Sequence, residues 1–480
     1  MLRRFAIIIL LFTLTACEEL DVACLLLELA VPNQHYNETE QFEGKLTDFE
    51  KWWGQFEGTA LGKLLEIALE KSPLLAQARS QLRETAYKYG MKEESVNDMM
   101  KNLNEYLKVS VLSPDSTREE NANLSLIHVI TGEIPRDFMQ GNKNYFRLFR
   151  FELDVDLFGK NKNWRKSAIA DIMSVVEIVK DTFSLIRMNI AHHFVYLKGH
   201  QVRQKLISKL DCECHETVTK IKDRVDAGIH DQSDLDIAKG FMDKAGEMVF
   251  NYGENIKIAF TSLLKETGIT DLAELMDIIG DDHELPKVDQ NVFAGTPMSV
   301  IQKRSDVQIK LNILKNACGL MGITLADKFP HVVIEGTLES AAKSIFDLLN
   351  IDNFSISYGY HVKQNIFKQA AVKSKINMYR SMYEKAQNEY TRVVQHALSE
   401  VGTTMVDKSI ISRKLELVYQ QLELLGNQLK VVKAKVEQSA AHLTEHLEVE
   451  NKMFMADDEK IGLESDGLVS TIKLVRALGG

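Results

Sequence analysis

Residues 149–157 of this chain read FRFELDVDL, in which apolar and charged side chains alternate strictly. Successive side chains of a strand point to opposite faces, so one face carries Phe151, Leu153, Val155 and Leu157. The opposite face carries Arg150, Glu152, Asp154 and Asp156. Transmembrane barrels with a water-filled lumen use strands of about 9–11 residues with this alternation, and we expect the four charged residues to face such a lumen. A half-buried strand of a soluble sheet would show the same pattern.

A very long helix is expected directly after this strand. Beyond Gly159 the apolar residues keep helical spacing to about Lys265, with one break at residues 226–231. At 1.5 Å per residue, the stretch from Leu157 to Gly228 forms a rod of about 107 Å. No globular core needs a helix of that length, and small and apolar residues recur along it as in helices packed side by side.

The order of helix, strand pair and long helical hairpin occurs twice along the chain. In the first half a helix begins at Leu61, and a short strand at residues 106–111 is the expected partner of residues 149–157. The second half repeats this order with a helix at 299–327, strands at 331–338 and 354–362, and a helical region from Asn365 onward. The predicted architecture is therefore mainly helical with a small β part, built from an internal repeat of about 200 residues.

These segments set the expected boundaries of the parts of the chain. The parts are a lipoprotein signal peptide at 1–16, a lipidated N-terminal segment at 17–60, a first repeat at 61–280, a linker at 281–298 and a second repeat at 299–480. Each repeat is expected to contribute a pair of strands to the membrane. Two pairs cannot close a barrel, because even small barrels use about eight strands and open sheet edges are not tolerated in lipid. We therefore expect the chain to form an oligomer.

The first seventeen residues, MLRRFAIIILLFTLTAC, indicate where the chain is delivered. Two arginines precede an apolar run that is too short to span a bilayer, and a small-residue cleavage pattern ends at Ala16. A cysteine directly after this pattern resembles the bacterial lipobox, in which Cys17 is acylated and becomes the mature N-terminus. Because Glu18 follows instead of the aspartate that retains lipoproteins at the inner membrane, we expect the outer membrane of a Gram-negative cell. An ordinary secretory signal with a chance cysteine is the alternative.

Composition argues against several other classes of protein. The formal net charge is -10 and no basic stripe is present, so nucleic acid is not an expected partner. No apolar run of about 20 residues follows Cys17, and therefore no transmembrane helix is expected. No Gly-rich phosphate loop and no Ser-His-Asp arrangement can be identified, so we expect neither a cofactor nor a catalytic site.

Cys212, Cys214 and His215 have the residue types of a metal cluster. Their spacing fits no usual zinc site, because positions i and i+2 of a helix point about 200° apart and cannot share one ion. We therefore expect no metal site there.

Several short stretches along the chain carry a resemblance to a known family. They are Trp52-Trp53-x-x-Phe56, Ala68-Leu69-x-x-Ser72-Pro73, Leu153-Asp154-x-Asp156-Leu157-Phe158-Gly159-Lys160, Arg224-x-x-x-Gly228-x-x-x-x-Ser233-Asp234-Leu235, Arg304-Ser305-Asp306-Val307 and Leu474-Val475-Arg476-Ala477-Leu478-Gly479-Gly480. In their order and spacing they resemble the TolC-type outer-membrane efflux channels, most closely the lipoprotein branch typified by OprM and NodT. The resemblance covers about residues 50–480.

The resemblance implies a homotrimer in which three chains contribute four strands each to one twelve-stranded outer-membrane β-barrel. The long helical hairpins then continue as a hollow α-barrel tube across the periplasm. Such a protein is the passive exit duct of a tripartite efflux or secretion system. Its implied partners are a periplasmic adaptor protein, an inner-membrane transporter that supplies the energy, and the lipid bilayer, which it contacts through the barrel and the acylated Cys17. It is not an enzyme.

The resemblance also implies a gate at the periplasmic ends of the two hairpins. The candidate gate residues are Asp231, Asp234, Asp236, Glu445 and Glu448, and Gly228 is the candidate turn residue. The two glutamates stand where the family has Asp-x-x-Asp. In a trimer they would form rings of six carboxylates, which bind cations and raise one another's pKa. The alternative is that they are surface acids on an exposed helix face.

Three stretches depart from the family pattern and keep other interpretations open. Ser439 replaces a glycine at the second turn, Ser305 replaces the proline of Arg-Pro-Asp, and residues 365–370 replace a Pro-x-Phe-x-Gly stretch. A partly degenerate channel is therefore one alternative. Another is a periplasmic helical-hairpin lipoprotein, such as an adaptor or a structural spacer, although the Gly- and Pro-rich β-domain typical of adaptors is not found. A membrane-tethered enzyme is the least favoured, because no site residues cluster.

Overall fold

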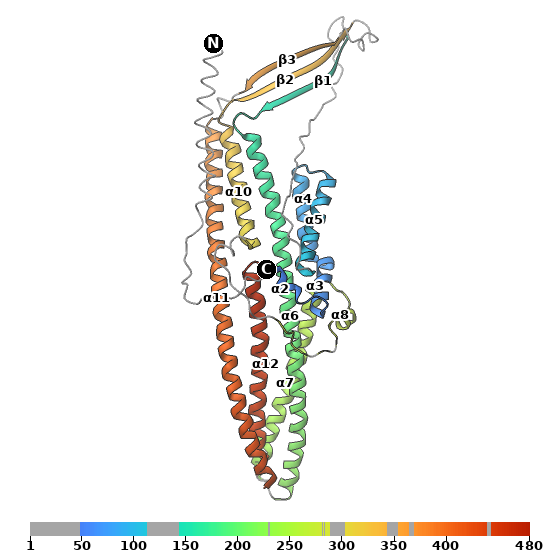
Figure 1. Ribbon diagram of the computed structural model, residues 1–480, viewed down its shortest axis with the longest axis vertical. Coiled ribbons are helices and arrows are strands. Elements are labelled where there is room, and N and C mark those ends of the chain that lie inside the picture. Colours follow the sequence, from blue (N-terminus) through green and yellow to red (C-terminus); the bar gives the residue numbers. More distant parts are fainter. Residues whose placement is uncertain are drawn as a thin grey trace.

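The protein is a long rod of helices with a small β-sheet at one end (Figure 1). The structure, a computed structural model, describes residues 49–112, 144–228, 231–280, 282, 284–288, 303–342, 354–363, 369–438 and 443–480. The predictions for the signal peptide, for Cys17 and for Ser439 lie outside these residues. Among the described helices, none combines the length and the apolar character needed to cross a bilayer.

Two long helical hairpins form the rod. The first consists of α6 (Lys160–Asp226) and α7 (Gln232–Thr267), and the second consists of α11 (Gln369–Gln438) and α12 (Leu443–Ala477). The 67 residues of α6 extend over about 100 Å at 1.5 Å per residue. The predicted mainly helical architecture and the predicted long helix with a break near residue 228 are confirmed.

Shorter helices surround the middle of α6. They are α2 (Phe49–Gly54), α3 (Ala60–Lys71), α4 (Pro73–Lys88), α5 (Glu93–Leu112), α8 (Leu272–Ile279) and α10 (Ser305–Ala326). Helices α3 and α4 pack against α6, and α10 packs against both α6 and α11. The main apolar core therefore combines both halves of the chain, with Leu64 of α3, Ile190 of α6 and Val475 of α12 all fully buried. The two repeats interlock instead of forming separate bodies.

The sheet at the end of the rod is antiparallel. Strand β1 (Asn144–Val155) pairs with β2 (His331–Ala342), which pairs with β3 (Phe354–Lys363). These strands cover most of the predicted segment 149–157 and all of the two segments predicted in the second half. A bulge between Arg147 and Phe149 shifts the register of β1, so the regular alternation begins at Phe149.

The strand predicted at residues 106–111 is wrong, because these residues belong to α5. Val96, Leu103 and Leu107 are buried at helical spacing on one face of that helix. Over six residues, the alternation of apolar and polar side chains was too short to distinguish a strand from the last turns of a helix that begins at Glu93.

Candidate functional site

Both hairpins turn at the end of the rod opposite the sheet (Figure 1). Gly228 follows α6 with φ of 73°, a left-handed conformation that glycine adopts more readily than other residues. The hydroxyl of Thr444 in α12 donates a hydrogen bond to Oδ1 of Asp234 in α7 at 3.1 Å. This bond joins the two hairpins, so the candidate gate residues from both halves of the sequence lie at the same end of the molecule.

The three aspartates of the first hairpin have different surroundings. Asp231 is exposed and precedes α7 without a capping hydrogen bond from its side chain. Asp236 is also exposed and accepts a hydrogen bond from Nε2 of Gln232 at 3.1 Å. Asp234 is half-buried next to the buried Leu235. Of the three, Asp234 is therefore the one whose described hydrogen bond reaches the second hairpin.

Glu445 and Glu448 lie at the start of α12, and both are half-buried. Nζ of Lys435 in α11 lies 3.2 Å from Oε1 of Glu445. The charge of Glu445 is therefore partly neutralised within the chain, which weakens the mutual repulsion expected of converging glutamates. The ring of six carboxylates stays a prediction.

A further carboxylate near this end, Glu450, was missed from the sequence. Its carboxylate lies 3.5 Å from Nδ1 of His446 and 3.9 Å from Nζ of Lys433 in α11. Burial raises the pKa of Glu450, His446 opposes this shift, and Glu213 of α6 adds to it. Residues of these types are ordinary on a helix surface, so the sequence held no motif that would single them out.

A second polar cluster holds α12 to the first hairpin higher up the rod. We call Arg203, Tyr252 and Asp458 the Asp458 clasp. The hydroxyl of Tyr252 in α7 donates to Oδ1 of Asp458 at 2.6 Å, and Nε of Arg203 in α6 lies 3.3 Å from the same oxygen. Burial and the bond to Asp458 raise the pKa of Tyr252, so its hydroxyl stays protonated as a donor. Asp458 lies more than 200 positions from each of its two partners in sequence, and no local pattern connects them.

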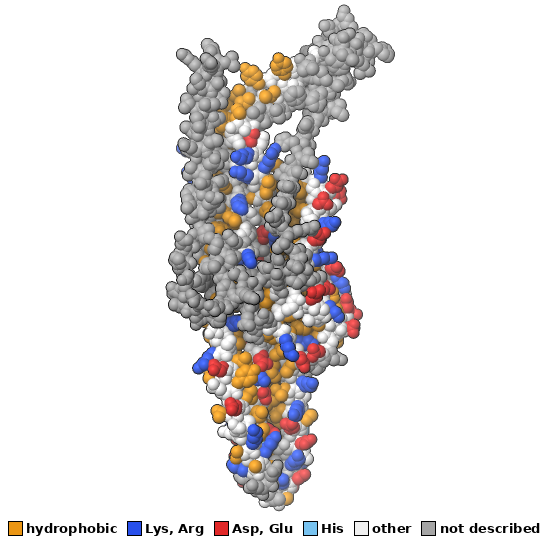
Figure 2. All heavy atoms as spheres, in the orientation of Figure 1, with side chains coloured by type: hydrophobic (Ala, Val, Ile, Leu, Met, Phe, Trp, Pro, Cys, Tyr) orange, Lys and Arg blue, Asp and Glu red, His pale blue; other side chains and the backbone are white. Residues whose placement is uncertain are grey.

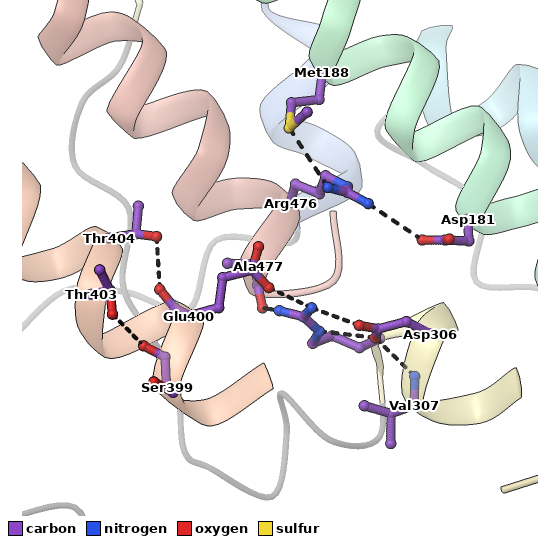
Figure 3. Close-up of polar contacts among 11 residues, drawn as sticks. Asp181, Met188, Asp306, Val307, Ser399, Glu400, Thr403, Thr404, Arg476 and Ala477 are labelled. Atoms are coloured by element: carbon purple, nitrogen blue, oxygen red, sulfur yellow. Dashed lines mark hydrogen bonds and ion pairs between the residues drawn. The ribbon is translucent and has the colours of Figure 1, made fainter. Parts of the chain in front are cut away.

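A group of charges around the buried Arg304 joins α6, α10, α11 and α12 near the middle of the rod (Figure 3). We call it the charged joint, and its members are Asp181, Arg304, Asp306, Glu400 and Arg476. Arg304 donates to Asp306 at 2.7 Å, to Glu400 at 2.6 Å and to the carbonyl of Ala477 at 2.8 Å. Arg476 lies 3.8 Å from Asp181, whose pKa is raised by burial. Burial also raises the pKa of Asp306, but hydrogen bonds from Arg304 outweigh it and hold the pKa below its usual value.

The charged joint brings together two stretches that carried the family resemblance. Arg304 and Asp306 belong to the stretch that departs from Arg-Pro-Asp at Ser305, while Arg476 and Ala477 belong to the stretch at residues 474–480. Their contact explains why arginine and aspartate are needed at residues 304 and 306. The sequence contained both stretches but gave no sign that they touch.

The charged residues predicted to face a lumen lie at the sheet end, far from the hairpin turns. The register aligns Arg150 with Thr337, Glu152 with Glu335 and Asp154 with Val333. Asp156 lies beyond the end of β1, and its Oδ2 accepts a hydrogen bond from the backbone N–H of Lys162 at 2.9 Å. It therefore caps the first turn of α6, a local role that the alternation did not predict.

The cysteines noted in the sequence lie on different sides of α6. Cys212 is exposed and Cys214 is buried, as the helical geometry requires. Burial raises the pKa of the Cys214 thiol to about 11, so it is protonated at neutral pH. Across the ranges that the structure describes, no three His, Cys, Asp or Glu side chains are grouped so as to hold a metal ion.

Comparison with known proteins relates this chain to outer-membrane channels. The family model described as "Outer membrane efflux protein" matches residues 300–480. The outer membrane protein OprJ of Pseudomonas aeruginosa is 21% identical over 330 residues, which are 68% of this chain and 68% of OprJ. The solved structure of the outer-membrane channel OprN covers 94% of this chain and 97% of its own with a TM-score of 0.73, at 18% identity. The C-terminal part of the chain, residues 300–480, therefore matches the outer membrane efflux protein family.

The family match includes most of the charged joint and the start of α12. A shorter similarity links this chain to the probable outer membrane lipoprotein SilC of Salmonella typhimurium. The two are 22% identical over 181 residues, which are 38% of this chain and 39% of SilC. At these identities the solved structures establish the fold, and the roles of individual residues have to be argued from the geometry above.

Proposed function

We propose that this protein is the outer-membrane exit duct of a tripartite efflux or secretion system and conducts its substrates passively. The observation that carries the proposal is a rod of two long helical hairpins that ends in an amphipathic sheet, in a chain whose residues 300–480 match the outer membrane efflux protein family. An inner-membrane transporter would supply the energy, and a periplasmic adaptor would connect it to the hairpin ends. No catalytic role is proposed for the duct itself.

The sheet supports placement in the outer membrane. Two rows across it are formed by Leu153, Ile334 and Tyr360, and by Phe151, Gly336 and Tyr358. The row between them is formed by Glu152, Glu335 and Gly359. Tyr358 and Tyr360 are 88% and 81% exposed, and Figure 2 shows hydrophobic side chains on the surface at this end. The exposed side chains of Ile334, Tyr358 and Tyr360 suit lipid, and the row that contains Glu152 and Glu335 suits a wet lumen.

An exposed apolar surface along α11 supports the assembly of several copies of the chain. Four exposed apolar residues follow one another at intervals of seven, namely Ile410, Leu417, Leu424 and Val431. We call this row the exposed seam. The residues that follow three of them directly, Val418, Leu425 and Val432, are buried within the chain. A seven-residue apolar repeat is typical of helices packed side by side. We propose that α7 of a neighbouring copy, with its exposed Phe250 and Ile258, covers the exposed seam.

Three copies joined in this way would close both the tube and the sheet. Each chain alone leaves sheet edges that cannot be tolerated in lipid, so closure has to come from neighbours. The homotrimer is therefore part of the proposal, and the proposed twelve-stranded barrel would need a fourth strand from each chain besides β1, β2 and β3. The first and second repeats, at 61–280 and 299–480, would each provide one hairpin of the tube.

The gate is proposed at the hairpin ends. Asp234 and Thr444 hold the two hairpins of one chain together there, and Asp231, Asp236, Glu445 and Glu448 add negative charge around them. Opening the tube requires that the start of α12 moves away from α7. The acids would then favour cations in the aperture, because rings of carboxylates stabilise them.

Membrane attachment through an acylated Cys17 completes the proposal. It is supported by the lipobox pattern in the sequence and by the similarity to a protein described as a probable outer membrane lipoprotein. Metabolic labelling with a radioactive fatty acid tests it directly. Labelled wild-type protein and unlabelled Cys17→Ser protein would support the anchor, whereas equal labelling of both would overturn it.

The function is tested by purifying the protein from outer membranes in detergent. Negative-stain images along the long axis should show a hollow, threefold particle, and planar lipid bilayers should show stepwise ion conductance. A solid monomeric rod without conductance would overturn the duct and favour a helical spacer lipoprotein. Conductance without threefold symmetry would overturn the trimer.

A further inference from the structure

Helix α12 is held differently along its two parts. Above Asp458, buried residues such as Leu468, Ile472 and Val475 belong to the main apolar core with α3 and α6. Below it, Leu447 and Phe454 are the residues of α12 that enter a smaller cluster with α6 and α7. The apolar contacts of α12 with the first half of the chain are therefore extensive above Asp458 and few below it.

The Asp458 clasp fixes α12 at this boundary. Arg203 and Tyr252 come from the two helices of the first hairpin, and both bind the same residue of the second hairpin. Their side chains are shielded, since those of Arg203 and Asp458 are only 21% and 14% exposed. Charge-assisted hydrogen bonds in such surroundings are about twice as strong as neutral ones. The clasp is thus the firmest polar attachment between the described parts of the lower α12 and the first hairpin.

The backbone hydrogen bonding of α12 is weakened at the same point. Nη2 of Arg203 donates to the backbone carbonyl of Asp458 at 2.9 Å. In an α-helix this carbonyl accepts the N–H of the residue four positions later, which is Gly462, so the two donors share it. Insertion of a side chain into the backbone hydrogen bonds and glycine in a helix interior are both causes of bending. A Cβ at Gly462 would meet Nη2 of Arg203 and displace the end of that side chain, so the clasp as described depends on a glycine there.

We infer that Asp458 and Gly462 form the fulcrum of the gate. The segment from Leu443 to Asp457 swings away from the first hairpin, while the clasp and the part of α12 above it stay in place. The inference rests on the proposed function and adds to it the point at which α12 bends. A bend of about 20° at the fulcrum would move the start of α12 by about 8 Å, since the segment below it is about 22 Å long. The bond between Thr444 and Asp234 breaks in this movement.

Crosslinks on either side of the fulcrum test the inference. Above it, a Cβ placed on Gly199 would lie 3.5 Å from Cβ of Ser465, which suits a disulfide between Gly199→Cys and Ser465→Cys. Below it, Asp234→Cys and Thr444→Cys can be joined by a short bifunctional thiosulfonate. Both pairs are made in a Cys212→Ser, Cys214→Ser background. Each trimer is then reconstituted in a planar lipid bilayer, and openings are counted before and after reduction.

The fulcrum predicts opposite results for the two crosslinks. The lower crosslink should abolish openings until it is reduced, and the upper disulfide should leave their frequency within about twofold of the reduced protein. Loss of openings with both crosslinks would mean that α12 moves as one piece, which overturns the fulcrum. Openings that persist with the lower crosslink would also overturn it. If no version conducts at any stage, the proposed duct fails, and the fulcrum fails with it.

A pair of glycines gives an independent test with a matched control. Gly462→Ala should displace Arg203 and stiffen the fulcrum, lowering the frequency of openings about fivefold, the ratio expected from the ~1 kcal/mol difference in helix propensity. Gly467→Ala is the control, because it changes the same helix by the same group. A Cβ there meets only Cγ2 of Ile411 at the ordinary distance of 3.6 Å. Equal effects of the two substitutions would contradict a fulcrum at Gly462.

Discussion

The middle of the rod and its lower end hold the same helices by different means. At the charged joint, Arg304 alone binds three groups from three helices, and the surrounding core is fully buried. At the hairpin ends, α7 and α12 are joined by the bond from Thr444 to Asp234 and by a small apolar cluster, and apolar side chains stay exposed on α11. The middle is extensively buried within one chain, whereas the lower end leaves apolar surface uncovered.

This difference shows where motion can occur. Regions with few buried contacts open locally at low free energy, and regions with dense contacts open only with the whole protein. A duct that gates at one end benefits from a firm middle and lightly tied ends. Four substitutions test this difference between the middle of the rod and its lower end.

The largest effect is expected from Leu424→Lys in the exposed seam. Leu424 is 67% exposed in the single chain, so we expect it to contribute stability through contact with a neighbouring copy. Burying a leucine contributes about 2 kcal/mol, and the loss occurs at each interface of the trimer. Size-exclusion chromatography with light scattering should show smaller particles. Glu423→Lys, one residue earlier and also exposed, is the control, and equal loss of trimer in both would remove the exposed seam from the interface.

Arg304→Ala should have the next largest effect, on the stability of the single chain. It leaves Asp306 and Glu400 without their shared cation, and a third of each side chain still reaches water. We therefore expect a loss of about 2–3 kcal/mol, less than for a fully buried pair. The thermal unfolding midpoint measures it. Arg413→Ala, which breaks an exposed pair with Glu416, should leave the midpoint almost unchanged. A similar midpoint for both variants would show that the charged joint does not stabilise the middle of the rod.

A pH dependence is expected from His192, which lies in the firm part beside α12. Burial lowers the pKa of His192 from 6.5 to about 4, and His193 and Lys473 lower it while Asp466 opposes them. The folded state therefore favours the neutral ring. Its contribution to stability is present above pH 6.5 and is lost as the pH falls toward 4.

Thermal unfolding between pH 7 and pH 4.5 measures this dependence. The midpoint of the wild-type protein should fall, and part of the fall should be absent in His192→Gln. His215→Gln is the control, because His215 is exposed on the same helix. An identical pH profile for wild type and His192→Gln would show that His192 is not buried as described.

The smallest effect on stability is expected from Thr444→Val at the hairpin ends. It removes one partly exposed hydrogen bond, worth about 1 kcal/mol or less. The unfolding midpoint should hardly change, whereas openings in planar bilayers should become more frequent. Thr403→Val removes only a bond to a carbonyl of its own helix and should change neither quantity. Unchanged openings in Thr444→Val would mean that its bond to Asp234 does not restrain the gate.

The long helices could be predicted from the sequence because their signal is repeated over many turns. The charged alternation of residues 149–157 also located β1, although Asp156 proved to cap α6. The strand predicted at residues 106–111 was wrong for the opposite reason, since a six-residue pattern is shorter than the helix that contains it. In each case the length of the periodic pattern decided whether the predicted helix or strand was correct.

The candidate site was predictable only where a local motif existed. Gly228 and Asp234 were proposed because one short stretch that contains both resembles the family. Arg203 and Asp458 were missed because their partnership depends on how two helices pack, 255 residues apart. The charged joint lies between these cases. Both of its stretches were noted for their resemblance to the family, but their contact required the fold.

The separation of these partners also has a consequence for how the protein matures. The bond from Arg304 to Ala477 closes a loop of 173 residues, and the Asp458 clasp closes one of 255. Such distant contacts form late and slowly, because loop closure has to precede them. Until the second half of the chain arrives, α6 exposes the apolar surface that α12 later covers, and exposed surface of this kind promotes aggregation. A long-lived, half-folded intermediate that depends on periplasmic chaperones during delivery is therefore the expected result of this architecture.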